Sequence, residues 1–270
     1  MATQPKDVQA SNEVTYVVKD HVATLTINRP DAQNTISGPM LDAMTHHLVT
    51  ANEDPNVRAI VLTATGRFFC AGLDLRSGSV SGGLSSGAGP ANLDLRNTPP
   101  TVLHAVDKPT ICALNGSAAG YGMDLALGCD IRIMADNAKL AAAFTARGVL
   151  PESGGTWILP RLLGWSKAAE IIFTGKTLSA QECLAEGLVS RVVAADQVAA
   201  VSAQMAADIV ANAPLAVQAA KRMMRMGMNE TFNDHVHHVF LQLLPLFRSE
   251  DFKEGMAAFL EKRKPNFKGR

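Results

Sequence analysis

The first quarter of the chain alternates between strand-like and helix-like patterns of apolar and polar residues. Residues 13–30, EVTYVVKDHVATLTINRP, contain two β-rich runs on either side of Lys19-Asp20 and end at Pro30, which predicts a β-hairpin. Residues 37–55 place apolar side chains at helical spacing, and residues 57–65, VRAIVLTAT, form a short apolar run typical of a buried strand. The opening pattern therefore predicts the order strand, strand, helix, strand.

The middle of the chain continues the same alternation. The segments KPTICALNG (108–116), GYGMDLALG (120–128), CDIRIMA (129–135) and KLAAAF (139–144) are typical of a strand, a helix, a strand and a further short strand, in that order. Strands that alternate with helices predict an α/β core.

Residues 77–92, SGSVSGGLSSGAGPAN, interrupt this rhythm with a Gly/Ser-rich composition that cannot pack a core. Two interpretations stay open for this flexible loop: a segment that orders on ligand binding, and a passive insertion.

The last third, from about Ser179 onward, has a helical pattern. Four apolar, helix-period stretches follow one another up to FKEGMAAFLEKRK. Residues 1–195 are therefore predicted to form the α/β core, and residues 196–270 a helical region that covers the core or a neighbouring subunit. The methionines between Met223 and Met228 are interpreted as gap-filling core or interface residues.

Composition and charge narrow the class of protein. The chain of 270 residues is 47% hydrophobic, and 25 Lys and Arg balance 25 Asp and Glu, so no global field attracts nucleic acid or an anionic membrane. The polar N-terminus lacks a secretory pattern, and no apolar run approaches the roughly 18 residues that span a bilayer. The four cysteines lie far apart, which favours buried thiols in a reducing compartment. These features predict a soluble, cytoplasmic protein.

Three familiar ligand signatures fail at specific positions. The sequence TGKT at 174–177 has Glu170 where a P-loop has its first glycine, and GYGMDL has Leu125 where a dinucleotide fingerprint has its third. His235, His237 and His238 lie on different helix faces without a matching partner, so no metal site is expected.

Two glycine-flanked turns and one carboxylate are the candidates for chemistry. The turns, GRFFCAGLDL (66–75) and NGSAAGYGMDLAL (115–127), each follow a strand-like run and bring backbone N–H groups to strand ends. Such donors suit a developing oxyanion, while tight strand-to-helix packing is the structural alternative. Glu152, in ARGVLPESGGTWILPRL (146–162), precedes a helical pattern and is either a helix-start carboxylate or a proton carrier.

Taken together, these stretches strongly resemble the enoyl-CoA hydratase/isomerase, or crotonase, superfamily. The resemblance runs from about Thr15 to the C-terminus and implies a spiral core of ββα units, a helical trimerisation region, and often a hexamer of two trimers. It is carried by INRPDAQNTIS, RFFCAGLDL, KPTICALNGSAAGYGMDLALGCDIRI, RGVLPESGGTWILPRLLG, TGKTLSAQECLAEGLVSRVV and FLEKRKPNFKG.

The resemblance implies a site that stabilises the enolate of an acyl-CoA thioester. The two oxyanion-binding N–H groups would be those of Leu73 and Tyr121. Asp124 occupies the position of the first glutamate of the hydratases, and Phe144 replaces the second. Three roles stay open for Asp124: a second proton carrier, a residue that orients water, and a polar residue that lines the pocket. Glu152 matches the acid of the P-[ED]-x-G-G turn in double-bond isomerases.

Isomerisation with Glu152 as general acid/base is therefore the leading expectation. Apolar neighbours would raise its pKa by keeping the pocket dry. The candidates are Phe144, Val149, Leu150 and Trp157, and each of them taken singly is interpreted first as an ordinary core residue. The alternatives are hydration of a 2-enoyl-CoA by Asp124 and Glu152, and a family member that binds CoA or RNA without turnover.

Coenzyme A is expected as part of the substrate, so no separate cofactor is implied. By family position its binding residues would be Arg29, Ala32, Gln33, Ala71, Gly72, Asp74, Leu75, Gly120, Phe259 and Lys262. In the family, the C-terminal members of this set are sometimes contributed by another subunit.

Overall fold

A computed structural model describes residues 12–74 and 98–270. The predicted flexible loop at 77–92 and the predicted CoA-binding residue Leu75 lie outside these ranges.

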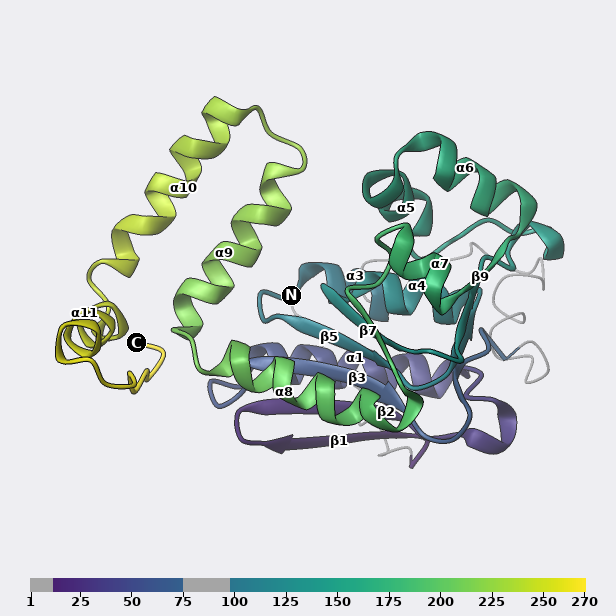
Figure 1. Ribbon diagram of the computed structural model, residues 1–270, viewed down its shortest axis with the longest axis horizontal. Coiled ribbons are helices and arrows are strands. Elements are labelled where there is room, and N and C mark those ends of the chain that lie inside the picture. The colour runs from purple at the N-terminus through teal and green to yellow at the C-terminus, as the bar shows by residue number, and fades with distance from the viewer. Residues whose placement is uncertain (1–11, 75–97) are drawn as a thin grey trace, which may run out of the picture.

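A six-stranded sheet forms the centre of the molecule (Figure 1). The strands lie in the order β1-β2-β3-β5-β7-β10; β1 and β2 pair antiparallel and the other neighbours pair parallel. The β1–β2 pair confirms the predicted hairpin. Their bounds are β1 Val14–Lys19, β2 Val22–Ile27, β3 Ala59–Ala64, β5 Thr110–Leu114, β7 Ile131–Ala135 and β10 Arg191–Val193. Every residue of β5 is buried, as expected for a parallel strand covered on both faces.

A second sheet of four very short strands lies beside the first. Its order is β4-β6-β8-β9, with bounds β4 Phe68–Cys70, β6 Ser117–Ala119, β8 Lys139–Ala141 and β9 Thr177–Ser179. Only the first half of the predicted strand at 139–144 is therefore a strand. The region after Ser179, predicted from its pattern to be helical, also contains β10, which lies between the first two predicted helical stretches and pairs with β7 in the main sheet.

The chain visits the two sheets alternately. β3 is followed by β4 and later α3 (Pro99–Ala105), β5 by β6 and α4 (Tyr121–Gly128), and β7 by β8 and α5 (Gly155–Leu163). This repeat is the expected spiral of ββα units. α6 (Trp165–Thr174) and α7 (Ala180–Ala185) follow before the chain returns to the main sheet.

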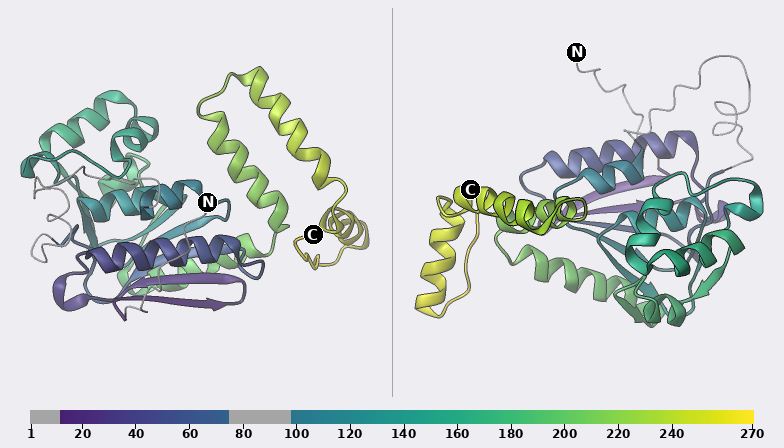
Figure 2. Two further views of the ribbon diagram at one scale, coloured as in Figure 1. Left: turned by 180° about the vertical axis from the view of Figure 1, so that it is seen from behind. Right: turned by 90° about the horizontal axis from the view of Figure 1, so that it is seen from above.

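Helices cover both faces of the main sheet (Figure 2). α1 (Gly38–Glu53) and α3 lie on one side, and α8 (Val198–Val210) lies on the other. α1 buries Met40, Met44 and Leu48, which fall on one stripe of the helix and confirm the apolar spacing seen in the sequence. α8, the first helix of the region 196–270, packs directly on the core.

The remaining helices form an arm that extends away from the core (Figures 1 and 2). It comprises α9 (Pro214–Gly227), α10 (Phe232–Leu246) and α11 (Glu250–Glu261). Ion pairs join α9 to the core: Lys221 Nζ lies 2.7 Å from the Asp130 carboxylate, and Arg222 lies 2.6 Å from that of Asp107. These contacts fix the base of the arm.

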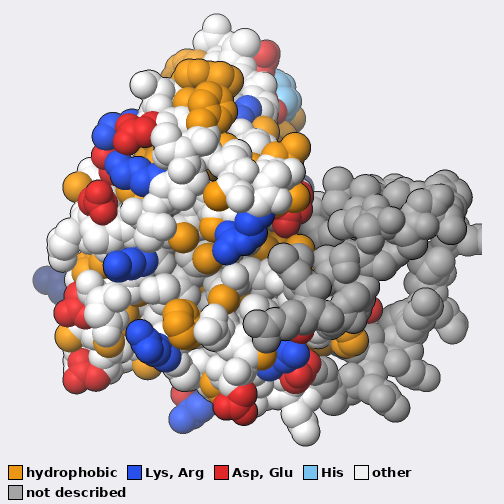
Figure 3. Space-filling model, turned by 90° about the vertical axis from the view of Figure 1, so that its right-hand side faces the viewer, with side chains coloured by type: hydrophobic (Ala, Val, Ile, Leu, Met, Phe, Trp, Pro, Cys, Tyr) orange, Lys and Arg blue, Asp and Glu red, His pale blue; other side chains and the backbone are white. Residues whose placement is uncertain are grey.

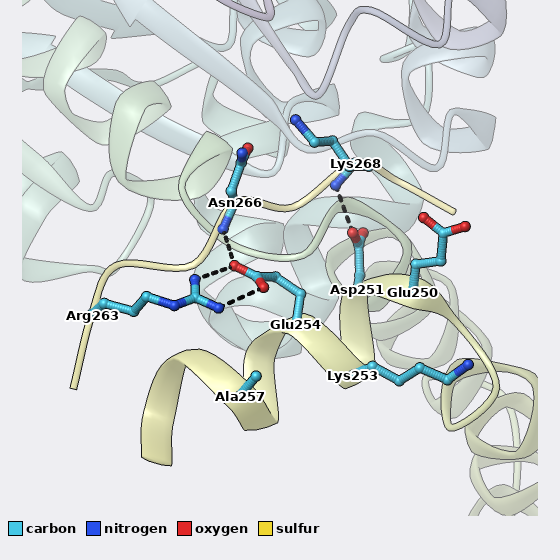
Figure 4. Close-up of a pocket in the computed structure, with 8 residues that line it drawn as sticks. All are labelled: Glu250, Asp251, Lys253, Glu254, Ala257, Arg263, Asn266 and Lys268. Atoms are coloured by element: carbon cyan, nitrogen blue, oxygen red, sulfur yellow. Dashed lines mark hydrogen bonds and ion pairs between the residues drawn. The ribbon is translucent and has the colours of Figure 1, made fainter. Parts of the chain in front are cut away.

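The C-terminal residues 263–270 fold back along α11 and form a strap (Figure 4). Arg263 pairs with both oxygens of Glu254 at 2.6 and 2.9 Å, and the buried carboxylate of Asp251 accepts the Lys268 N–H at 2.6 Å. Because these acids lie on the helix and their partners lie on the strap, the contacts fix the end of α11.

Within the described ranges, no single helix is long and apolar enough to cross a membrane, although the bent pair 195–210 and 214–227 passes the same test when the two segments are taken together.

Candidate active site

A cavity of about 880 Å³ opens where the two glycine turns meet the segment before α5. Most of the predicted site residues line it. These are Arg29, Ala32, Gln33, Ala71, Gly72, Leu73, Asp74, Gly120, Tyr121 and Glu152. Asp31, Thr35 and Arg147 also line the cavity and were not predicted from the sequence.

The turn at Leu73 presents a backbone donor that the described residues leave unpaired. Ile36 pairs with both neighbours of Leu73, since its N–H donates to the Gly72 carbonyl at 2.9 Å and its carbonyl accepts the Asp74 N–H at 2.9 Å. In the described part of the chain nothing accepts a hydrogen bond from the Leu73 N–H. Gly72, with φ of +113°, provides the backbone conformation that L-residues rarely adopt.

Tyr121 presents the second donor as the first residue of α4. Its N–H belongs to the first helical turn, whose donors have no partner within the helix. Gly122 lets this turn pack against the end of β4, because a Cβ at this position would lie 2.2 Å from the Cys70 carbonyl oxygen. The glycine pattern therefore serves close packing, and this packing brings the two N–H groups to one cavity.

Glu152 lies outside the first turn of the following helix. α5 begins at Gly155 after the N-cap Gly154, so the interpretation of Glu152 as a first-turn helix carboxylate is wrong. Its side chain is exposed to the cavity, yet the surrounding protein desolvates it and raises its pKa, against the opposing effect of a backbone hydrogen bond. Glu152 is both exposed and desolvated because it lines a cavity, where protein surrounds the side chain without covering it. A carboxylate with a raised pKa suits both removal and return of a proton.

Asp124 lies close enough to Glu152 for their charges to interact, yet it does not line the cavity. Its carboxyl group is 0% exposed; Oδ2 accepts the Ser153 N–H at 3.2 Å, and Oδ1 has no hydrogen-bond partner among the described residues. Burial raises its pKa to about 7, and the charge of Glu152 adds to the rise. Gly155 packs so closely that a Cβ there would lie 2.3 Å from Oδ1. Asp124 thus holds the turn that carries Glu152.

The apolar walls are only partly those predicted. Phe144 is 3% exposed and lines the cavity together with Val149. Leu150 and Trp157 do not line it, and their prediction as walls is wrong. Leu150 faces solvent at 63% exposure, and the Trp157 ring packs edge-on against His104 with 5.2 Å between centroids.

Arg29, predicted to contact CoA, is already held by two carboxylates. Its guanidinium lies 2.7 Å from Asp74 and 3.2 Å from Glu13. The turn that carries it depends on Asn34, a residue that sequence reasoning missed: its buried side chain accepts the Arg29 N–H at 2.8 Å and donates to the Phe68 carbonyl at 2.7 Å. The only sequence signal for this role is the asparagine that follows the RPDAQ segment. Asparagine tolerates positive φ, and Asn34 has a φ of +54° in the structure.

The two C-terminal candidates are not near this cavity in the single chain. Phe259 is 80% exposed on α11, and Lys262 ends that helix in the arm. Neither residue lines the cavity.

The profile of the family described as enoyl-CoA hydratase/isomerase matches residues 18–270. The chain belongs to this family. The 2,3-dehydroadipyl-CoA hydratase of Escherichia coli (strain K12) is 34% identical over 255 residues, covering 93% of this chain and 97% of the relative. The 1,2-epoxyphenylacetyl-CoA isomerase of the same organism is 34% identical over 254 residues, covering 94% and 97%.

Solved structures of the family share the fold. The crystal structure of an enoyl-CoA hydratase from Bacillus anthracis has a TM-score of 0.88 at 32% identity, and the match covers 96% of this chain and all of that one. The ββα spiral is therefore the crotonase fold, and the protein is an enzyme of the enoyl-CoA hydratase/isomerase family that acts on acyl-CoA. The names of its relatives include both hydratases and isomerases.

Proposed function

We propose that this family member moves a double bond within an enoyl-CoA thioester. The observation that carries the proposal is one cavity that Leu73, Tyr121 and Glu152 line together. The thioester oxygen accepts hydrogen bonds from the two N–H groups. These bonds stabilise the enolate, and each donor typically raises the reaction rate by a factor of about 10²–10³. Glu152 removes a proton from one carbon and returns it to another.

The position of Asp124 also supports isomerisation. Hydration in this family would need a second acid to hold the attacking water, and Phe144 stands where that second acid is expected. Asp124 is buried away from the cavity and binds the Ser153 N–H. Proton transfer by Glu152 alone fits this arrangement better than a water held between two carboxylates.

Hydration is the second candidate, favoured by the closeness of Asp124 to Glu152, whose charge raises the pKa of Asp124. A panel of 2-enoyl-, 3-enoyl- and dienyl-CoA esters separates the two reactions. Isomerisation shifts the double bond without a change of mass, whereas hydration adds the mass of one water and removes the absorbance of the conjugated enoyl group. Only the first result agrees with the proposal; water addition as the main reaction contradicts it.

We further propose that the arm assembles this protein into a homotrimer, either alone or as half of a hexamer. α10 has no buried residue in the single chain, and large apolar side chains of the arm are exposed. They include Phe232 at 80%, Phe240 at 54%, Phe247 at 47% and Phe259 at 80%. By contrast, charged side chains of both signs are spread over the opposite side of the core, with hydrophobic ones gathered near the top (Figure 3).

Light scattering after size-exclusion chromatography tests the assembly. Phe240→Asp places a charge on the exposed face of α10 and is expected to yield monomers, while Val17→Asp, on the exposed edge strand β1, leaves the assembly intact. A wild-type monomer, or a Phe240→Asp variant that still forms trimers, contradicts the proposal. In the trimer, Phe259 and Lys262 would contact the CoA bound by a neighbouring subunit.

A further inference from the structure

Arg147 is a cation in the cavity wall that carries Glu152. It ends the short 3-10 turn Thr145–Arg147, is exposed, and lines the cavity. Its Nη1 donates to the Ala143 carbonyl at 2.7 Å, which leaves the other N–H groups of the guanidinium available. In the described ranges no carboxylate lies within 4.0 Å of it, as an ion pair requires.

None of the carboxylates that line the cavity, which are Asp31, Asp74 and Glu152, forms an ion pair with Arg147 in the described ranges. Arg29 is paired with Asp74 and Glu13. The Glu152 carboxylate has a raised pKa, and the only opposing influence is a backbone hydrogen bond. A cation paired with that carboxylate would lower its pKa instead. The charge of Arg147 is therefore available to a ligand.

The residues around Arg147 indicate the chemistry of a ligand that it could bind. Residues 145–150 are all exposed. Val149, which lies between Arg147 and Glu152 in the sequence, is 55% exposed and also lines the cavity. An apolar side chain next to a free cation suits a chain that is hydrophobic along its length and anionic at one end. A guanidinium also binds carboxylate or phosphate through two parallel hydrogen bonds.

We infer that Arg147 binds an anionic group of the thioester substrate, either a carboxylate at the far end of the acyl chain or a phosphate of the CoA. This inference rests on the acyl-CoA substrate of the proposed function. Arg147 shares a segment of the cavity lining with Glu152, whereas the predicted CoA-binding residues Arg29 and Asp74 come from other segments, and this favours the acyl carboxylate. The enzyme would then prefer CoA monoesters of dicarboxylic acids.

The test compares the binding of two saturated six-carbon CoA esters, hexanoyl-CoA and adipyl-CoA, which differ only in a terminal methyl or carboxylate. Calorimetry on the wild-type protein is expected to give at least about fivefold tighter binding of adipyl-CoA. Arg147→Met keeps a long side chain without charge and should reduce this ratio to about one. Arg147→Lys should keep part of it, because the charge remains and the planar fork is lost.

Arg161→Met is the matched control. Arg161 also donates Nη1 to the carbonyl four residues earlier, that of Trp157 at 3.1 Å, but it lies over the Trp157 ring and does not line the cavity. Its replacement should leave the adipyl/hexanoyl ratio unchanged. The corresponding N-acetylcysteamine thioesters, which lack the phosphates of CoA, distinguish the two anions.

Three results decide the inference. Loss of the adipyl preference in Arg147→Met, in both the CoA and the N-acetylcysteamine series, supports the acyl carboxylate. Equal weakening of both CoA esters, with no effect on the N-acetylcysteamine esters, supports a CoA phosphate. Changes below about twofold throughout, equal changes in Arg161→Met, or no binding by the wild-type protein overturn the inference. Saturated esters do not react, so a failure of the proposed isomerisation would appear separately, as absent turnover of the enoyl esters.

Discussion

Asp124 should make the stability of this enzyme decrease as the pH rises from about 4 to about 7. Its pKa is about 7 in the folded protein, against 3.8 for a free side chain. Between these values the folded state binds one proton more than the unfolded state, so the free energy of unfolding falls with increasing pH. At about 1.4 kcal/mol for each pKa unit, the Asp124 contribution lost over this window is up to about 4 kcal/mol.

Asp124→Asn isolates this effect, because it keeps an oxygen for the Ser153 N–H but cannot ionise. Urea unfolding is measured at a fixed protein concentration from about pH 4 to about pH 7. The free energy of unfolding of the variant minus that of the wild type should rise by about 1.4 kcal/mol per pH unit.

The control variant is Asp42→Asn, which alters an exposed carboxyl of α1 and should show no comparable slope. A constant difference between Asp124→Asn and the wild type over the whole window would refute the assignment of a buried, protonated Asp124.

Two further predictions concern packing. Gly122→Ala would place a Cβ 2.2 Å from the Cys70 carbonyl oxygen. This clash should lower the free energy of unfolding by about 2 kcal/mol or more, and it should reduce turnover because it separates the two turns. Unchanged stability would contradict this packing. Deletion of residues 264–270 removes the hydrogen bond that the Lys268 N–H donates to the buried Asp251 carboxylate. The midpoint of thermal unfolding should therefore fall. An unchanged midpoint would show that the strap does not stabilise the arm.

The long periodic elements could be predicted from the sequence because each carries its own signal. The hairpin 13–30, the helix α1 and the buried strands β3 and β5 have apolar spacing over many residues. The strands of the second sheet have three residues each, too few to show alternation, and they exist because the ββα repeat brings them together. β10 is a three-residue run between two predicted helical stretches, and it is a strand because it pairs with the edge of β7.

Only those parts of the site that have a local sequence motif could be predicted. The glycines that position the Leu73 and Tyr121 N–H groups, and the turn that carries Glu152, are recognisable motifs. Which side chains line the cavity depends on tertiary packing, so Trp157 was predicted as a wall and instead packs on His104. Arg147 went unnoticed because its significance comes from the absence of an ion-pair partner among the described residues, which no sequence pattern reveals.

The most direct test of the account is the rate at which Glu152→Gln converts a 3-enoyl-CoA into the conjugated 2-enoyl-CoA, followed by absorbance. Glutamine keeps the shape of the side chain but cannot carry the proton, so the rate should fall at least about 100-fold while the folded structure is retained. Turnover equal to that of the wild type would contradict the assignment of proton transfer to Glu152.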